Sequence, residues 1–298
     1  MKKLFAICTA CFCVAFVFSS CAVNERETEP SPTAGEPVPE HYEVSYREMT
    51  VESGDHTLYG VAAVPDTGSP PPLAVFSHGL CGSYTNAAAW AEELASRGIA
   101  VYAFDFYGGS EESRSGGSTL EMSVMTEAAD LKAVLKTLRE SGLFDNSRII
   151  LIGESQGGFV SAVTAADDAD IAGMILCYPA FVRRDEMLAQ FSSDDDIDEV
   201  YTFKWFTAGR PYAADIWDYD VYNEIGAYEG PVLLLHGDRD GLVPLSCSEQ
   251  ACDSYKNARL HVILGASHGF AGEQHTEAMA ESLDFLREIG MLPPAHTD

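Results

Sequence analysis

The sequence predicts an α/β fold, in which a mostly parallel central sheet is covered by helices on both faces. Short apolar runs, typical of strands that are buried on both sides, recur along the chain. Stretches with helical patterning separate these runs, as they do in folds built from alternating strands and helices. The chain has 298 residues and 46% hydrophobic content, which is enough for one large core.

The first twenty residues have the composition of a bacterial signal peptide. Lys2 and Lys3 precede an apolar run over residues 4–18, which is short for a membrane-spanning helix. Cys21 follows two serines, in a pattern that resembles the lipobox of bacterial lipoproteins. We therefore expect residues 1–20 to be removed and Cys21 to carry a lipid. Plain secretion and a retained anchor are the alternatives.

Residues 21–42 are rich in proline, glutamate and threonine and have few bulky apolar side chains, so they predict a flexible linker. The exported protein would then be held only by its lipid on the outer side of the bacterial cytoplasmic membrane. One globular domain is expected over residues 43–290, with a short tail over residues 291–298.

The elements of this domain follow in order. Two segments of alternating hydrophobicity, joined by a turn at residues 53–55, predict strands over residues 44–51 and 57–64. Further strands are expected at residues 73–77, 99–104, 148–152, 171–177, 232–235 and 260–264. Helices are expected at residues 86–96, 120–140, 155–166, 248–255 and 273–289.

Residues 181–229 interrupt this alternation with a stretch rich in aromatic and acidic side chains. Because it falls between two core strands, we expect an insertion that caps the edge of the sheet where open α/β sheets bind ligands. Trp205, Trp217 and Tyr219 are candidates for substrate contact, since aromatic side chains suit planar or apolar groups. The alternative is that these aromatics pack only on one another.

Gly153-Glu154-Ser155-Gln156-Gly157 follows a predicted strand and opens a predicted helix. This setting is that of a nucleophile elbow, in which glycines permit a tight turn and strained dihedral angles raise the serine hydroxyl. Ser155 is therefore the candidate nucleophile. The backbone N–H of Gln156, at the start of the helix, is placed to stabilise an oxyanion.

A serine nucleophile needs a base, and the base needs an orienting acid. Asp238 and Asp240 lie in one loop after a predicted strand, and His268 lies in the loop after the next. The chain order serine, acid, histidine is that of α/β hydrolases. Three other histidines compete with His268 for the role of base: His236, His261 and His275.

Several motifs together resemble the α/β-hydrolase superfamily over about residues 43–290 and, within it, bacterial feruloyl and cinnamoyl esterases and related carboxylesterases. The motifs are Phe76-Ser77-His78-Gly79-Leu80, Phe104-Asp105-Phe106, Gly153-Glu154-Ser155-Gln156-Gly157-Gly158, Tyr228-Glu229-Gly230-Pro231-Val232, the loop of residues 236–244, and Gly265-Ala266-Ser267-His268-Gly269-Phe270.

The resemblance implies roles for individual residues. It implies that Asp240 is the orienting acid and His268 the base, with Asp238 shaping the loop. It also implies that the backbone N–H of Leu80 is a second oxyanion donor. His78 precedes this donor in the same loop, and we expect it to brace the loop, with a catalytic role as the alternative.

The predicted function is that of a serine esterase that acts on small carboxylic esters through an acyl-enzyme, with aromatic or hydroxycinnamoyl esters as the candidate substrates. An aminopeptidase or dipeptidyl peptidase, an acyltransferase, or a non-catalytic binding lipoprotein are the alternatives. The formal net charge of −28 argues against a nucleic-acid partner. No cysteine and histidine spacing typical of zinc sites is found, so we do not expect a structural zinc site. The acyl-enzyme mechanism needs neither a metal nor an organic cofactor, and we expect none.

Overall fold

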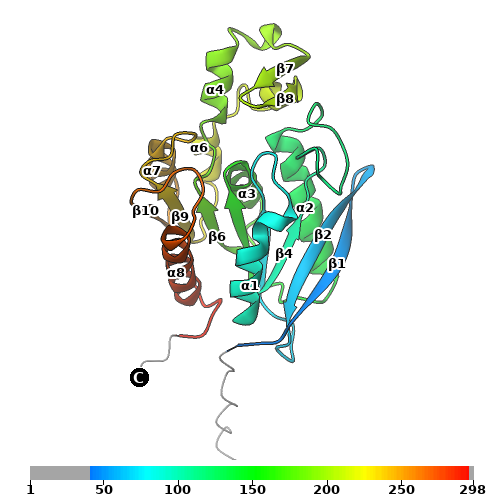
Figure 1. Ribbon diagram of the computed structural model, residues 1–298, viewed down its shortest axis with the longest axis vertical. Coiled ribbons are helices and arrows are strands. Elements are labelled where there is room, and N and C mark those ends of the chain that lie inside the picture. The colour runs from blue at the N-terminus through cyan, green and yellow to red at the C-terminus, as the bar shows by residue number, and fades with distance from the viewer. Residues whose placement is uncertain (1–40, 295–298) are drawn as a thin grey trace, which may run out of the picture. The chain divides into compact units, whose positions relative to one another are not determined.

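The computed structural model describes residues 41–294 of the chain. Within this range, eight strands form the central sheet (Figure 1). Its strands lie in the order β1-β2-β4-β3-β5-β6-β9-β10. β1 pairs antiparallel with β2, and β2 with β4, while the pairs from β4 to β10 are parallel. The mostly parallel sheet expected from the sequence is thus confirmed. The strands of this sheet are β1 Val44–Ser53, β2 His56–Pro65, β3 Leu73–Ser77, β4 Ala100–Phe104, β5 Ile149–Glu154, β6 Ile171–Cys177, β9 Val232–Gly237 and β10 Ala258–Ile263.

The signal segment 1–20, Cys21 and the linker up to residue 40 lie outside the described residues, as do residues 295–298 of the expected tail. Within residues 41–294, no helix is long and apolar enough to cross a membrane.

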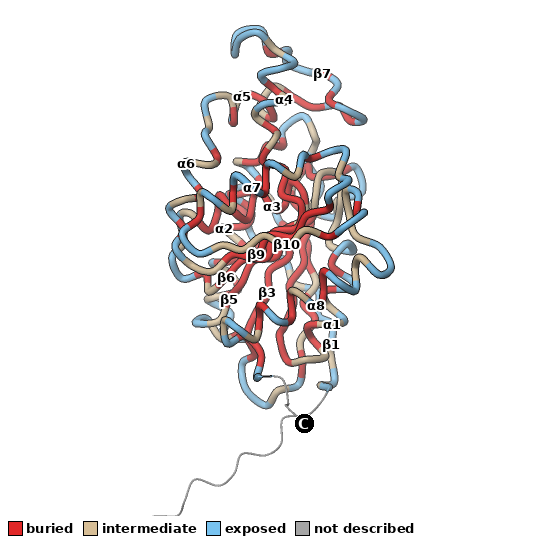
Figure 2. Tube along the Cα trace, turned by 90° about the vertical axis from the view of Figure 1, so that its left-hand side faces the viewer, coloured by how far each residue is buried: buried red, intermediate tan, exposed pale blue. Residues whose placement is uncertain are grey.

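Helices cover both faces of the sheet, and two core clusters lie between the sheet and the helices. One cluster includes residues of α2, α3 and α7, and the other includes residues of α1 and α8. Successive residues of β3 alternate between them: Leu73 and Val75 join the first, Ala74 and Phe76 the second. Figure 2 shows the resulting band of buried strands. The helices named here are α1 Ala88–Ser96, α2 Val124–Glu140, α3 Gln156–Ala166, α7 Leu245–Ser254 and α8 Glu273–Glu288.

Residues 181–229, which we call the insertion, lie between β6 and β9. They form α4 Arg183–Gln190, β7 Val200–Phe203, β8 Phe206–Gly209, α5 Pro211–Ala214 and α6 Val221–Ile225, and β7 pairs antiparallel with β8. Several of their aromatic rings pack on one another, with ring centroids 5.9 Å apart for Phe203 and Phe206 and 5.2 Å apart for Phe206 and Tyr212. These aromatic rings also belong to the core cluster that includes α2, α3 and α7, so the insertion shares its core with the main domain.

The insertion is also tied to the segment that precedes α2. Thr119 donates a 2.7 Å hydrogen bond to the carbonyl oxygen of Thr207, and the hydroxyl of Ser123 donates one of 2.5 Å to Asp215. The same serine caps α2, since its side chain accepts from the backbone N–H of Thr126. This cap explains why α2 begins at Val124 rather than at residue 120, where the sequence predicts it.

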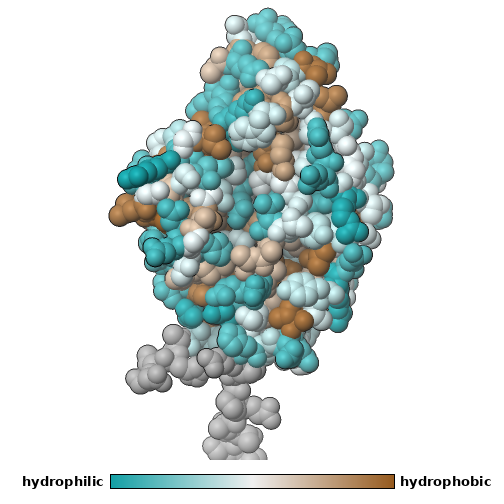
Figure 3. All heavy atoms as spheres, in the orientation of Figure 1, coloured by the Kyte–Doolittle hydropathy of each residue, from teal (hydrophilic) through white to brown (hydrophobic). Residues whose placement is uncertain are grey.

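The surface drawn in Figure 3 is mostly hydrophilic, with hydrophobic residues in small separate groups. All four cysteines of the described residues are free: Cys177 and Cys247 are buried, Cys252 is half-buried, and Cys81 is exposed.

Candidate active site

Ser155 lies at a sharp turn between β5 and α3, and its backbone has the left-handed angles φ 52° and ψ −116°. The turn is crowded. A Cβ atom on Gly157 would lie 2.1 Å from the carbonyl oxygen of Ser77, and one on Gly153 would lie 2.4 Å from the carbonyl oxygen of Gly157. Glycine is therefore required at both positions, and the strained serine is held by its surroundings.

The structure brings Ser155, His268 and Asp240 into one hydrogen-bonded series. Nε2 of His268 lies 3.0 Å from the hydroxyl oxygen of Ser155, and Nδ1 lies 2.7 Å from Oδ2 of Asp240. The three residues follow β5, β10 and β9 respectively, whose carboxyl ends meet at one edge of the sheet. This is the geometry needed for a histidine to take a proton from a serine while an acid orients its ring.

Asp240 is fixed by several donors. Its Oδ1 accepts from the backbone N–H groups of Leu242 at 2.8 Å and Val243 at 2.9 Å, and its Oδ2 lies 3.4 Å from Nε2 of the buried His236. Burial alone would raise the pKa of Asp240, but the hydrogen bonds from His236, His268 and the backbone hold that pKa well below its usual range. The carboxylate therefore stays charged beside the histidine.

The other candidates for the acid and the base have different partners. Asp238 accepts from the backbone N–H of Gly265 and so links the loop after β9 to the loop after β10. Nδ1 of His236 lies 2.7 Å from the hydroxyl of Ser248. His261 contacts Glu277 on α8 at 2.8 Å.

The loop after β3 passes directly beside Ser155, since a Cβ atom on Gly79 would lie 3.2 Å from the Cβ atom of the serine. Among the described residues, neither the backbone N–H of Leu80 nor that of Gln156 donates to another protein atom. Both are thus available to an oxyanion next to Ser155. The buried ring of His78 contacts the carbonyl oxygen of Gly79 at 2.8 Å and holds this loop.

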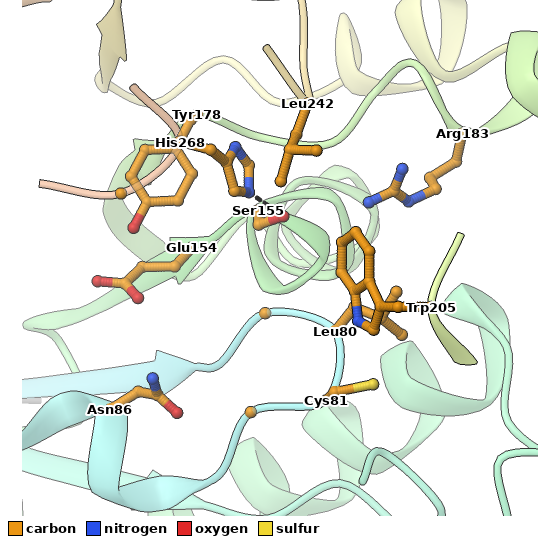
Figure 4. A pocket seen from close by; sticks show the side chains of 13 residues that line it. Leu80, Cys81, Asn86, Glu154, Ser155, Tyr178, Arg183, Trp205, Leu242 and His268 are labelled. Carbon is orange, nitrogen blue, oxygen red and sulfur yellow. Dashed lines mark hydrogen bonds between the residues drawn. The ribbon is translucent and has the colours of Figure 1, made fainter. Parts of the chain in front are cut away.

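A cavity of about 260 Å³ opens beside Ser155 (Figure 4). Trp205 of the insertion lines it, and this side chain is also 58% exposed. The other two aromatic candidates do not line it: Trp217 and Tyr219 pack against the core cluster that includes α2 and α3. The expected substrate contact thus has a structural basis only for Trp205. The full lining is Gly79, Leu80, Cys81, Gly82, Asn86, Glu154, Ser155, Tyr178, Arg183, Trp205, Leu242, His268 and Gly269.

Of the lining residues that were not selected from the sequence, three carry groups that bear on the chemistry of the site. The ring of Tyr178 packs edge-on to that of His268, with centroids 4.7 Å apart. Burial raises the pKa of Glu154 to about 7, although hydrogen bonds from Trp90 and Tyr178 act in the opposite direction. Arg183 begins α4, and its side chain is 3% exposed. The sequence does hold a signal for Arg183, because Arg183-Arg184 is a pair of cations at the start of the insertion in an acidic chain.

The side chain of Gln156 connects the insertion to the site. Its Oε1 accepts a 2.7 Å hydrogen bond from the hydroxyl of Tyr212, and its Nε2 donates a 2.8 Å bond to the buried Glu127. Burial raises the pKa of Glu127 to about 8, while the bond from Gln156 lowers it. Among residues 41–294, no group of three or more histidine, cysteine or acidic side chains is arranged to hold a metal ion.

Comparisons with known proteins agree with this architecture. Residues 68–193 match the model of a hydrolase family described as serine aminopeptidase, S33. An uncharacterised protein of Mycobacterium tuberculosis is 28% identical over 284 residues, which cover 94% of this chain and 92% of that protein.

Among solved structures, Est1E from Butyrivibrio proteoclasticus with ferulic acid bound has a TM-score of 0.72 at 23% identity, over 81% of this chain and 99% of that one. The esterase Pf2001 of Pyrococcus furiosus has a TM-score of 0.58 at 22% identity, over 82% of this chain and 93% of that one. The chain therefore has the α/β-hydrolase fold, and over residues 68–193 its sequence resembles a family described as serine aminopeptidases.

Proposed function

We propose that this protein is a serine esterase that hydrolyses small carboxylic esters through an acyl-enzyme on Ser155. The single observation that carries the proposal is the series Asp240–His268–Ser155, with separations of 2.7 and 3.0 Å at a strained elbow. A structural histidine or a buried serine would not require this combination of strain, alignment and an open cavity.

In the first half of the reaction, the Ser155 oxygen attacks the ester carbonyl while His268 accepts the hydroxyl proton. The backbone N–H groups of Leu80 and Gln156 hold the oxyanion. His268 then gives its proton to the leaving alcohol as the carbon–oxygen bond of the ester breaks.

In the second half, His268 removes a proton from water, the resulting hydroxide attacks the acyl carbon, and Ser155 leaves with the proton returned to it. One water is consumed and one acid and one alcohol are released. The charged Asp240 keeps the imidazole in the required tautomer throughout. This sequence of steps needs no cofactor.

A fluorophosphonate probe and p-nitrophenyl acetate test the proposal together. Wild type should be labelled on Ser155 and should hydrolyse the ester, while Ser155→Ala should lose both, with a rate lower by several orders of magnitude. Ser69→Ala, which changes an exposed loop serine, is the matched control. Near-normal turnover by Ser155→Ala would overturn the proposal.

The second candidate function is a serine aminopeptidase, which the description of the matching family favours. A peptide amino terminus is an ammonium group and needs a carboxylate nearby. Glu154 is the carboxyl group of the cavity lining, but the lining also carries the cation Arg183, which repels an ammonium group. A panel that compares p-nitrophenyl esters with aminoacyl p-nitroanilides separates the two activities. Addition of an alcohol acceptor reveals an acyltransferase by the new ester formed.

We further propose that the mature protein is a lipoprotein with its lipid on Cys21. The support is the sequence of residues 1–21. Mass spectrometry of the protein from membranes should find a lipidated Cys21 at the amino terminus, and Cys21→Ala should release the protein or block its processing. An unmodified terminus beyond residue 21 in wild type would refute this assignment.

A further inference from the structure

The cavity beside Ser155 contains a buried cation that the steps proposed above do not use. Arg183 comes from the insertion, six residues after the end of β6, and its side chain is 3% exposed. Figure 4 shows its guanidinium group directed toward the space between Leu242 and Trp205. It therefore faces the volume that a bound ester would occupy.

The charge of Arg183 is only partly balanced by the protein. One nitrogen of the guanidinium pairs with Glu186, but the same carboxylate also pairs with Lys204. Two cations thus share one anion. The hydroxyl of Tyr212 is a further hydrogen-bond partner of Arg183 but carries no charge, because burial raises its pKa far above neutrality.

The guanidinium also has an unused donor. Nε of Arg183 is buried and has no hydrogen-bond acceptor among the described residues. A buried donor without a partner destabilises a fold, and for a charged group the effect is larger than for a neutral one. An arginine kept in this state beside a nucleophile is explained if a ligand completes its hydrogen bonds.

Glu186 is not among the residues that line the cavity, and the carboxyl group that does line it, that of Glu154, lies away from Arg183. In Figure 4, Glu154 is on the opposite side of Ser155 from Arg183. The remaining lining around the guanidinium includes Trp205 and Leu242, which offer apolar contact rather than charge.

We propose that Arg183 binds a carboxylate of the substrate, so that the preferred esters carry an anionic group a few atoms from the scissile carbonyl. This inference rests on the proposed esterase function. The planar guanidinium group suits a carboxylate, because its remaining N–H donors can bond both carboxylate oxygens. Trp205 and Leu242 then pack against the short carbon chain that joins the carboxylate to the ester.

The test uses two p-nitrophenyl esters of equal shape and different charge. One is the mono-ester of adipic acid, and the other is the 6-methylheptanoate, in which a branched methyl pair replaces the carboxylate. We expect wild type to have the higher kcat/KM for the adipate ester. In Arg183→Met the ratio of the two kcat/KM values should fall on the order of 10- to 100-fold, as for the loss of a hydrogen bond to a charged group.

Arg184→Met is the matched control. Arg184 is the neighbouring arginine, but it donates to the carbonyl oxygen of Trp217 at 2.9 Å and does not line the cavity. In Arg184→Met the ratio of the two kcat/KM values should stay as in wild type. Arg183→Lys, which keeps the charge and loses the planar pairing, should give an intermediate ratio and serves as the folded variant if Arg183→Met does not fold by circular dichroism.

A binding measurement separates this inference from the esterase proposal. On Ser155→Ala protein, adipate should bind in titration calorimetry, and the affinity should fall when Arg183→Met or Arg183→Lys is added. If wild type is not labelled by the fluorophosphonate probe but adipate still binds, the esterase proposal is refuted and the anion site is supported. Ester hydrolysis with a ratio that is unchanged in both Arg183 variants, or a wild-type preference for the neutral ester, would overturn the anion site.

Discussion

Glu154→Gln should change how the stability of the protein depends on pH. The ordinary pKa of this carboxyl is 4.5, and burial raises it to about 7 in the folded protein. Below pH 4.5 the group is protonated in both the folded and the unfolded state. As the pH rises toward 7, the unfolded chain releases its proton while the folded protein retains it, so the free energy of unfolding falls progressively. Above about pH 7 this loss of stability is complete.

The magnitude follows from the interval between the two pKa values. Each pH unit in that interval changes the free energy of unfolding by about 1.4 kcal/mol. Between pH 5 and pH 8 the wild type should therefore lose about 2–3 kcal/mol through this residue. The glutamine stays neutral and can still accept the bond that Trp90 donates at 3.2 Å, so the variant should escape this loss.

Urea unfolding followed by circular dichroism measures the effect. The free energy of unfolding of Glu154→Gln, relative to wild type, should rise by about 2–3 kcal/mol from pH 5 to pH 8. Glu92→Gln, on the exposed side of α1, controls for the loss of one negative charge and should show no such rise. A difference between Glu154→Gln and wild type that is the same at both pH values would refute the reasoning.

Three further predictions concern the site. Asp240→Asn should lower kcat on the order of 10⁴-fold because it favours the wrong tautomer of His268, and Asp238→Asn should lower kcat far less. Steady-state kinetics on p-nitrophenyl acetate measures both losses, and a larger loss in Asp238→Asn would contradict the assignment of the acid. Trp205→Ala should raise KM for bulky aromatic esters by about 5- to 150-fold more than for acetate esters, as expected for ~1–3 kcal/mol of pocket contact, whereas Trp217→Ala should leave this discrimination unchanged. Gly157→Ala should destabilise the fold by more than about 1–3 kcal/mol in thermal unfolding, because its Cβ would lie 2.1 Å from a backbone oxygen of β3, and a wild-type melting temperature would count against the close packing of the elbow.

The sequence was sufficient to predict the parallel sheet and the grouping of Ser155, His268 and Asp240. Strand patterning is local, and residues that follow parallel strands meet at one edge whatever the details of packing. The same reasoning puts the start of α2 four residues early, because apolar periodicity continues into residues 120–123 while the cap on Ser123 fixes the boundary.

The insertion was the part that could not be predicted in detail. Trp205, Trp217 and Tyr219 are alike in sequence, but only the first reaches the cavity. Which side chain faces inward depends on how the β7–β8 hairpin and α5 pack, and this is decided by contacts distant in sequence, such as Tyr212 with Gln156. The position of Arg183 in the cavity was missed for the same reason.

The bond from Tyr212 to Gln156 affects how the substrate selectivity of the proposed esterase could be re-engineered. An insertion between two strands of a common sheet could be exchanged as a unit between related proteins if it made no specific contacts with the sheet domain. In this protein the hydroxyl of Tyr212 in the insertion donates a hydrogen bond to the side chain of Gln156. The same side chain donates to the buried Glu127 on α2. A chimaera that replaces residues 181–229 without a tyrosine at this point would leave the side-chain oxygen of Gln156 without its buried donor, while the bond from Gln156 to Glu127 would remain. To transfer substrate selectivity, an exchange of the insertion would therefore have to include the residues at positions 127 and 156, which form this hydrogen-bonded series with it.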